Sequence, residues 1–333
     1  MAKKMICLND YLYNGDTVLK ILHNYSRDLK ESAIATGNSV DMMHSNFLLR
    51  EIELLEHNDF LTSQAKRIRD FYKYMTAEYP YLAFSFKGRI KSLIRLEEKI
   101  NGNIAEFIYN YHSKTGGFPS ENEIKEQITR IRDLLAYRIV VSYPQCHLKD
   151  SDDRTERELD IIYEVANKLP SFLEQRGFNA EVSAIEDHIE SDRIAEELRP
   201  YYRDYIVNPS PYGYRSIHII FYDVSSRCDL EVQIRTKEMD DFAEIGPANH
   251  LGYEKRQESD RARRAKIPLG ENIFFDEAYE RGMLLQTLDL SKIKVNMFTA
   301  YNNQLINDEC GLFRGRLITP YEHLSRFQND LID

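Results

Sequence analysis

The chain has 333 residues, of which 42% are hydrophobic, and a formal net charge of −10. An acidic chain has no global positive field for indiscriminate nucleic-acid binding, so a bound polyanion would have to meet a local basic cluster. No run approaches the ~20 apolar residues needed to cross a bilayer, and residues 1–10 lack a signal-peptide pattern, so we expect a cytoplasmic protein. The four cysteines lie far apart without a CxxC pair, which argues against a zinc site or a disulfide framework.

Residues 1–80 are predicted to be helical. Apolar side chains recur at helical spacing between Phe47 and Tyr79, and Pro80 ends the pattern. No motif with a chemical meaning stands out in this region. We therefore interpret it as helices that pack against the rest of the chain or form an oligomer.

A basic segment follows, from Phe86 to Ile100. If it is helical, Lys91, Arg95 and Lys99 lie at four-residue spacing on one face. Like charges at that spacing repel each other, and a bound triphosphate would turn the repulsion into attraction through charge-assisted hydrogen bonds. The alternative is a solvated basic face that is relieved by the neighbouring glutamates.

Ser120 and Glu123 form a capping box, which predicts a helix that continues to Leu135 and leads into a short strand at 137–141. Asp133 then falls at the end of the helix, where the helix dipole disfavours a carboxylate unless a cation is near. Mg²⁺ is a natural candidate, since it takes one or two carboxylates plus phosphate oxygens. The alternative is a salt bridge from Asp133 to a neighbouring arginine.

The remainder of the chain alternates helices and strands. Two strands, Ile217–Val224 and Asp229–Arg235, are separated by a short turn, which predicts an antiparallel hairpin. The other predicted elements are a helix around 159–166, a strand around 180–185, a charged loop or exposed helix at 186–203, a helix at 237–255 and a mostly helical tail at 266–333. The pattern predicts an α/β or α+β domain built around a mixed β-sheet.

The loop before the hairpin contains two prolines and a glycine that would fix its shape. Tyr214 follows Gly213 and would stand clear of the backbone, where an aromatic ring can stack on a nucleobase for ~1–3 kcal/mol. Ser216 and His218 are two residues apart, so they share a strand face. The alternative is a tyrosine-rich turn that packs on the core.

The second strand of the hairpin alternates strictly. Its apolar residues point one way, while Glu231, Gln233 and Arg235 share the other face. A solvent-facing sheet would give the same pattern. The mixture of a carboxylate, an amide and a guanidinium is nevertheless what a site for a metal and two phosphorylated ligands requires.

Taken together, these stretches resemble the synthetase domain of the RelA/SpoT family of alarmone synthetases. The resemblance covers about Phe86 to Lys255, roughly half of the chain. Its most specific parts are DYIVNPSPYGYRSIH at 204–218 and EVQIRTKEM at 231–239, and the segments GRIKS at 88–92 and DLLAYRIVVS at 133–142 follow the family's order.

The resemblance implies a mixed β-sheet flanked by helices, similar to nucleotidyltransferases, with helical extensions at both ends. The corresponding division is an N-terminal extension at 1–80, a synthetase domain at 81–260 and a C-terminal extension at 261–333. It also implies a GTP pyrophosphokinase, an enzyme of the stringent response that moves pyrophosphate from ATP to the 3′-hydroxyl of GDP or GTP and makes (p)ppGpp.

Roles for individual residues follow from the same resemblance. For ATP, the resemblance implies that the adenine is sandwiched between Arg89 and Arg138. It implies that the phosphates of ATP are held by Lys91, Ser92 and Lys99. The residues implied for the acceptor nucleotide are Tyr214, His218, Gln233 and Arg235. Asp133 and Glu231 are implied as catalytic residues that bind Mg²⁺, with Glu231 the candidate base.

The sequence departs from the family's pattern at Tyr212 and Ser210, both beside the expected acceptor pocket, and in a longer stretch between Asp133 and Tyr214. The chain has no His-Asp pair, which the family's hydrolase half requires, so we expect a synthetase-only, small alarmone synthetase type that forms a homo-oligomer. Two alternatives stay open. One is a toxin of the same fold that modifies adenine nucleotides or the 3′ end of tRNA, gripped by the basic cluster at 255–266; the other is an inactive nucleotide-sensing module.

Overall fold

The computed structural model describes residues 5–14, 16, 18–56, 58–80, 82–90, 93–129, 131–144, 147–149, 153–183, 191–210, 213–244 and 273–287. These residues form two compact units. The first draws on Met1–Leu61, Ile90–Leu134 and Arg264–Pro320, and the second on Thr62–Arg89 and Leu135–Arg263 together with Tyr321–Asp333. Among the described helices, none combines the length and the apolar character that a membrane span requires.

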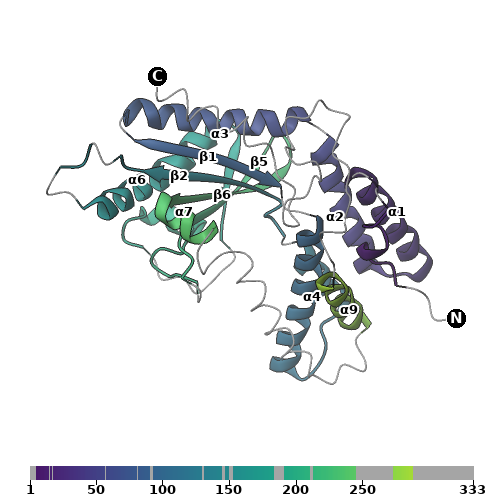
Figure 1. The fold of residues 1–333 in the computed structure, drawn as a ribbon. Helices are drawn as coiled ribbons and strands as arrows, with labels where there is room; N and C mark the ends of the chain where they lie inside the picture. Colours follow the sequence, from purple (N-terminus) through teal and green to yellow (C-terminus); the bar gives the residue numbers. More distant parts are fainter. Residues whose placement is uncertain are drawn as a thin grey trace. The chain divides into compact units, whose positions relative to one another are not determined.

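The first unit is helical, as the sequence predicts for the N-terminal region. In it α1 packs along α2, and α4 packs along α9 (Figure 1). The capping box is confirmed: the Ser120 N–H donates to Glu123 Oε2 at 2.7 Å, and the Glu123 N–H donates to Ser120 Oγ at 3.4 Å. The elements are η1 (Leu8–Asp10), α1 (Val18–Thr36), α2 (Ser39–Glu56), α4 (Leu93–Thr115), α5 (Glu121–Thr129) and α9 (Ile273–Gln286).

A cluster of polar side chains lies in the core of this helical unit. Glu97 of α4 is 1% exposed and accepts a hydrogen bond from Tyr25 Oη at 2.5 Å. Its second oxygen lies 2.7 Å from His44 Nε2. Arg281 of α9 pairs with Asp41 of α2 at 2.9 Å. Glu97 thus joins α4 to α1 and α2, and the pair of Arg281 with Asp41 joins α9 to α2.

The contribution of the Glu97 carboxylate to stability should appear in the pH dependence of unfolding. Burial by itself raises the pKa of Glu97, but His44, Tyr25 and Arg281 outweigh it, so the pKa lies below its ordinary value. The stabilisation is therefore present above the unfolded-state pKa of about 4.3 and is lost as the pH falls through the lowered folded-state pKa. In urea unfolding between pH 7 and pH 3, the wild type should lose stability more steeply than Glu97→Gln, by up to about 1.4 kcal/mol per pH unit.

The control for that experiment is Glu106→Gln, an exposed position on the same helix. It should keep the wild-type slope. A Glu97→Gln profile that runs parallel to the wild type would contradict the assignment, because it would mean that the carboxyl binds a proton equally in both states.

The second unit is built on a mixed six-stranded sheet, which confirms the predicted fold class. The strand order is β1-β2-β6-β5-β3, with β4 paired to β5. β2 and β6 are parallel, whereas β5 is antiparallel to β6, β3 and β4. The strands are β1 (Ala83–Ile90), β2 (Leu135–Ser142), β3 (Phe178–Glu181), β4 (Tyr202–Asp204), β5 (Ile217–Asp223) and β6 (Cys228–Thr236).

One face of this sheet is covered by α6 (Arg154–Glu174), as Figure 1 shows. Tyr202 Oη donates to the carbonyl of Ala166 in α6 at 2.6 Å, which places Tyr202 on that face. Ile219 pairs with Tyr202 and Val232 pairs with Ile219, so both share the same face and are buried. The opposite face carries His218 and its partner Gln233, together with Glu231. Helix α7 (Lys237–Glu244) contacts both β2 and β6.

Helix α3 (Asn58–Glu78) is anchored to the sheet by one ion pair within the second unit. Arg67 donates to both oxygens of Asp223 at 2.9 and 2.5 Å, and its guanidinium lies 4.2 Å from the centre of the Phe178 ring. Asp223 is fully buried and also accepts hydrogen bonds from the hydroxyls of Ser225 and Ser226. The turn of the β5–β6 hairpin and α3 therefore meet at one carboxylate.

The predicted helix from Ser120 to Leu135 is too long. α5 ends at Thr129, and residues 131–134 form an irregular connection to β2. Ile131 and Leu135 are buried as the helical spacing predicted, but they reach the core from a connecting segment and from a strand. Asp133 consequently does not end a helix, and the argument from the helix dipole does not apply to it.

Candidate active site

The polar face of β6 is buried, so the alternative of a solvent-facing sheet is wrong. Glu231, Gln233 and Arg235 are 9%, 5% and 2% exposed. They alternate with Leu230, Val232 and Ile234, which are completely buried on the other face. Burying a carboxylate and a guanidinium is costly unless each is paired and hydrogen-bonded. Their partners therefore define the site.

Glu231 is held at both oxygens by neighbouring side chains. His218 Nδ1 lies 3.0 Å from Glu231 Oε1, and Gln233 Nε2 donates to Oε2 at 2.6 Å. His218 and Gln233 are direct partners across the β5–β6 pair, so the hairpin register brings all three side chains to one face. Arg235 Nη2 donates to Gln233 Oε1, which fixes the orientation of that amide.

Tyr214 connects Arg235 to His218. Its hydroxyl accepts a hydrogen bond from Arg235 Nη2 at 2.9 Å and lies 2.8 Å from His218 Nε2. Burial raises the pKa of Tyr214, against the opposing effect of Arg235, so the hydroxyl keeps its proton at neutral pH. It can then donate to His218 Nε2 in the tautomer whose Nδ1–H donates to Glu231. The hydrogen bonds thus run without a break from Arg235 to Glu231.

The loop that presents Tyr214 is fixed by backbone geometry. Gly213 has φ 73°, a conformation that favours glycine, and its N–H donates to the Ser210 carbonyl at 2.8 Å. Ser210 Oγ accepts from the Tyr214 N–H at 3.2 Å, and the Ser210 N–H donates to the Tyr214 carbonyl. Ser210, one of the departures from the family's pattern, therefore has a local role that a lysine side chain could not fill, because lysine has no acceptor.

Arg138 joins the same face from β2. It pairs with Gln233 in the parallel β2–β6 ladder, and its Nη1 donates to Asp240 Oδ1 at 2.9 Å. Asp240 also lies 3.4 Å from Arg235 Nη1. The structure therefore brings together six side chains to which the sequence analysis gave separate roles, within one unit: Arg138, Tyr214, His218, Glu231, Gln233 and Arg235. Asp240, to which it gave none, lies between the two arginines.

Of the other predicted site residues, Lys99 and Asp133 lie in the helical unit, and the side chains of the remaining three lie outside the described residues. Lys99 and Asp133 form an ion pair in the helical unit. Arg89 is in β1, but its side chain lies outside the described residues, as do Lys91, Ser92, Tyr212 and the basic cluster at 255–266. Within the described ranges, no group of three or more His, Cys, Asp or Glu side chains is arranged to hold a metal ion.

Two residues of the network were missed by sequence reasoning. Asp240 lies in the first turn of α7, and Tyr205 places its ring 5.0 Å from the His218 ring at an edge-to-face angle. The signal for Asp240 was an acidic residue in the first turn of a helix that directly follows the strand bearing Arg235. Tyr205 gave no comparable signal, because its contact depends on how the loop folds back over β5.

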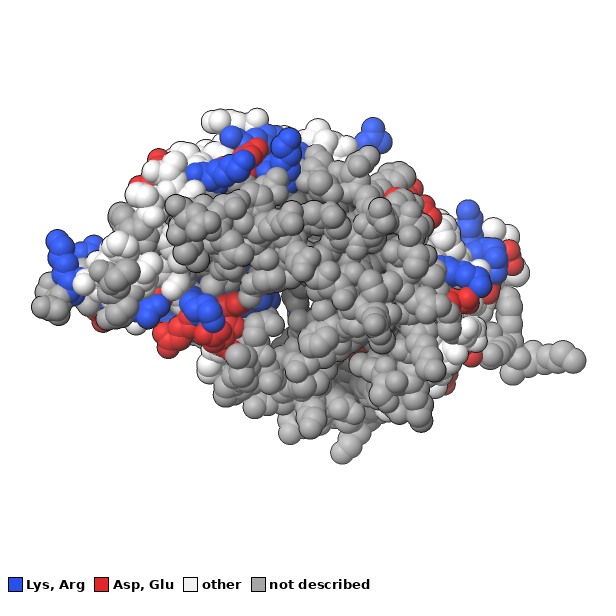
Figure 2. All heavy atoms as spheres, turned by 45° about the horizontal axis from the view of Figure 1, so that its top comes forward, with Lys and Arg blue, Asp and Glu red and all other residues white. Residues whose placement is uncertain are grey.

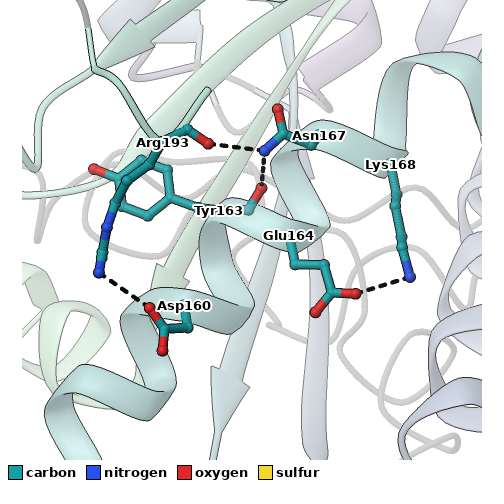
Figure 3. A pocket seen from close by; sticks show the side chains of 6 residues that line it. All are labelled: Asp160, Tyr163, Glu164, Asn167, Lys168 and Arg193. Atoms are coloured by element: carbon teal, nitrogen blue, oxygen red, sulfur yellow. Dashed lines mark hydrogen bonds and ion pairs between the residues drawn. The ribbon is translucent and has the colours of Figure 1, made fainter. Parts of the chain in front are cut away.

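A pocket on α6 is lined by none of the residues of this network. It has a volume of about 410 Å³, and its walls are formed by α6 and Arg193 (Figure 3). Arg193 pairs with Asp160 at 3.0 Å, and Lys168 pairs with Glu164 at 2.9 Å. Because the charges of this pocket pair with each other, it offers less to a charged ligand than the polar face of β6.

The described surface shows mixed charge. On the face drawn in Figure 2, basic and acidic side chains lie next to each other on the described residues. This agrees with a formal net charge of −10. Recognition of an anionic ligand would therefore depend on individual arginines and lysines, such as the two that share Asp240.

Comparison with known proteins is consistent with this geometry. A family model described as the region found in RelA / SpoT proteins matches residues 88–258. Curated relatives called GTP pyrophosphokinase match at 44% identity over 60 residues in Haemophilus influenzae and 28% over 162 residues in Photobacterium angustum. These matches cover 18% and 37% of this chain, and 8% and 22% of the respective relatives.

A third relative, GTP pyrophosphokinase rsh of Brucella ovis, is 47% identical over 55 residues, which is 16% of this chain and 7% of that protein. The chain therefore spans less than a quarter of each of these relatives. The family model extends from the end of β1 through β2, β5, β6 and α7, so it includes every residue of the network around Glu231. Because that model covers half of the chain and coincides with the buried polar face, the chain belongs to the RelA/SpoT family.

Proposed function

We propose that this protein is an ATP-dependent pyrophosphokinase that transfers pyrophosphate from ATP to the 3′-hydroxyl of GDP or GTP. The observation that carries the proposal is the buried network on β6, in which Glu231 is joined through His218 and Tyr214 to Arg235. A carboxylate held beside a tyrosine ring and two arginines suits a reaction that removes a proton from one nucleotide and a pyrophosphate from another. Family membership and the relatives' names support the same reaction.

The proposed reaction is a displacement at the β-phosphorus of ATP. The 3′-oxygen of the acceptor attacks the β-phosphorus of ATP, the bond to the oxygen bridging the α- and β-phosphates breaks, and AMP leaves. Glu231 would accept the hydroxyl proton. Gln233 Nε2 donates to one oxygen of its carboxylate and His218 Nδ1 lies 3.0 Å from the other, so both side chains hold the carboxylate in place.

The remaining residues would bind and orient the two nucleotides. Arg235 lies over one face of the Tyr214 ring, 5.2 Å from its centre, and the proposal assigns the opposite face to the acceptor base. Arg138 would contact the adenine of ATP, with Arg89, while Lys91, Ser92 and Lys99 would hold the phosphates. Arginine suits both tasks, because a guanidinium can stack through its plane and donate through its edge.

Mg²⁺ belongs to the proposal, with Asp133 and Glu231 as the residues that would hold it. Both are carboxylates, the ligand type that Mg²⁺ prefers, and phosphate oxygens would complete the set. When bound, the ion would neutralise charge on the transferred phosphates. The proposal also keeps synthesis without hydrolysis, and assembly into a homo-oligomer, as predictions.

An acceptor panel tests the proposed function. The protein is incubated with γ-labelled ATP and Mg²⁺ together with GDP, GTP, ADP or tRNA, and labelled products and AMP are measured. We expect label on GDP or GTP with one AMP released per transfer, and the matched Glu231→Gln protein serves as the blank. Label on ADP or tRNA alone would replace the proposed acceptor, and nucleotide binding without any transfer would indicate a sensing module.

A further inference from the structure

We propose that Asp240 is a positioning residue that fixes Arg138 and Arg235 together and thereby couples the donor and acceptor nucleotide pockets. The inference rests on the proposed function for the identity of those pockets. Asp240 itself belongs to neither pocket in that assignment. Its role follows from where its carboxylate lies.

A single carboxylate oxygen serves two guanidinium groups from neighbouring strands. Asp240 Oδ1 lies 2.9 Å from Arg138 Nη1 and 3.4 Å from Arg235 Nη1. All three side chains are buried or nearly so, at 4%, 11% and 2% exposure for Asp240, Arg138 and Arg235. In such surroundings charge–charge contacts are screened far less than at the surface.

The charges explain why the carboxylate is needed. Arg138 and Arg235 come from adjacent parallel strands, two residues apart in the register, and their like charges would repel. Asp240 offsets this repulsion, and its position in the first turn of α7 favours a negative charge through the helix dipole. Without it, one arginine would turn away from the other, and the face would lose its arrangement.

The geometry also explains how one residue would affect two ligands. Holding a guanidinium by its edge leaves the plane to stack on a base, so the contact with Asp240 sets the orientation of the Arg138 plane. Arg235 uses Nη1 for Asp240 and Nη2 for Tyr214 and Gln233. A displacement of Arg235 would therefore pass directly to Tyr214, on which the acceptor base is expected to stack.

The test compares Asp240→Asn with Asp241→Asn, the next residue of the same helix. Asp241 pairs with Lys237 on the exposed side of α7, so its change is the matched control. Steady-state kinetics should show the KM of ATP and the KM of the acceptor both raised by about 10-fold in Asp240→Asn. Asp241→Asn should leave both constants at their wild-type values. If Asp240→Asn does not fold, Asp240→Glu, which keeps the charge and shifts it by one methylene, should show the same joint rise.

A double-mutant cycle separates coupling from general loosening. Arg138→Ala should raise the KM of ATP less in the Asp240→Asn background than in the wild type, because the orientation it depends on is already lost. Additive effects, a change in one KM alone, or a fall in kcat with both KM values unchanged would overturn the proposal. A purely structural role would lower thermal stability without this pattern.

Binding measurements keep this inference separate from the proposed function. The dissociation constants of GDP and of an ATP analogue with a non-cleavable α,β-bridge are measured by calorimetry for the wild type and for Asp240→Asn. If the wild type binds both but transfers nothing, the proposed function fails while a joint loss of affinity in the variant still supports the coupling. If transfer occurs but the variant binds both like the wild type, the coupling fails alone. A wild type that binds neither nucleotide overturns both.

Discussion

Replacement of Glu231 by Gln is expected to lower kcat of pyrophosphate transfer by about 10²–10⁴-fold, the contribution typical of a positioned general base. The amide has nearly the same shape, so it can still contact His218 and Gln233, but it cannot accept a proton. KM values should change much less than kcat, because the arginines and Tyr214 remain. Initial rates with ATP and the acceptor each varied would measure both constants.

Glu181→Gln is the matched control for this change. Glu181 is in β3 of the same sheet and pairs with Ile220, so its replacement removes another carboxylate of that sheet. Its rate should equal that of the wild type. An unchanged rate in Glu231→Gln would remove Glu231 from the mechanism.

Loss of the Arg67 side chain is expected to destabilise the sheet unit by about 3–5 kcal/mol. Arg67→Ala leaves Asp223, which is fully buried, without the guanidinium that neutralises it, and removes the stacking over Phe178. Serine hydroxyls would still donate to Asp223, but they carry no charge. Urea unfolding, with hydrogen exchange of the β5 and β6 amides to localise the effect, would measure the loss.

The control is Arg193→Ala, which removes an arginine from the same unit. Its ion pair with Asp160 is largely exposed, and exposed pairs contribute about 1 kcal/mol or less. The segment that carries it also stays attached to α6, because Asn167 bonds the backbone of Arg193 and Ala195. Equal losses for the two variants would show that burial of Asp223 does not set the cost.

Much of the secondary structure was predictable from the sequence, because its signals are local. The hairpin, the alternation on β6 and the capping box each depend on residues within a few positions of one another. The error at α5 has the same origin. Ile131 and Leu135 continue the helical spacing and are buried, yet pairing of Leu135 with Leu230 in β6 draws that part of the chain into a strand. Spacing alone cannot register a partner almost a hundred residues away.

The candidate site was predictable in its residue types but not in its connections. Sequence reasoning assigned Arg138 to one nucleotide and Arg235 to the other, whereas the structure joins them through Asp240. That contact depends on α7 packing over the β2–β6 pair, a long-range arrangement. The sequence also left open whether the polar face of β6 faces solvent. Only the closure of the sheet by its neighbours decides that question.

The place of β6 between β2 and β5 determines which parts of the candidate site can change without altering the others. A strand that is paired along both edges holds its side chains in fixed positions. The conformational entropy of Glu231, Gln233 and Arg235 is therefore lost when the protein folds and not when a ligand binds. Ser210, Gly213 and Tyr214, by contrast, are joined to one another by hydrogen bonds within their own loop. A change at Ser210 would therefore alter the loop that presents Tyr214 to the proposed acceptor, while the pairing of β6 with both of its neighbours stays the same.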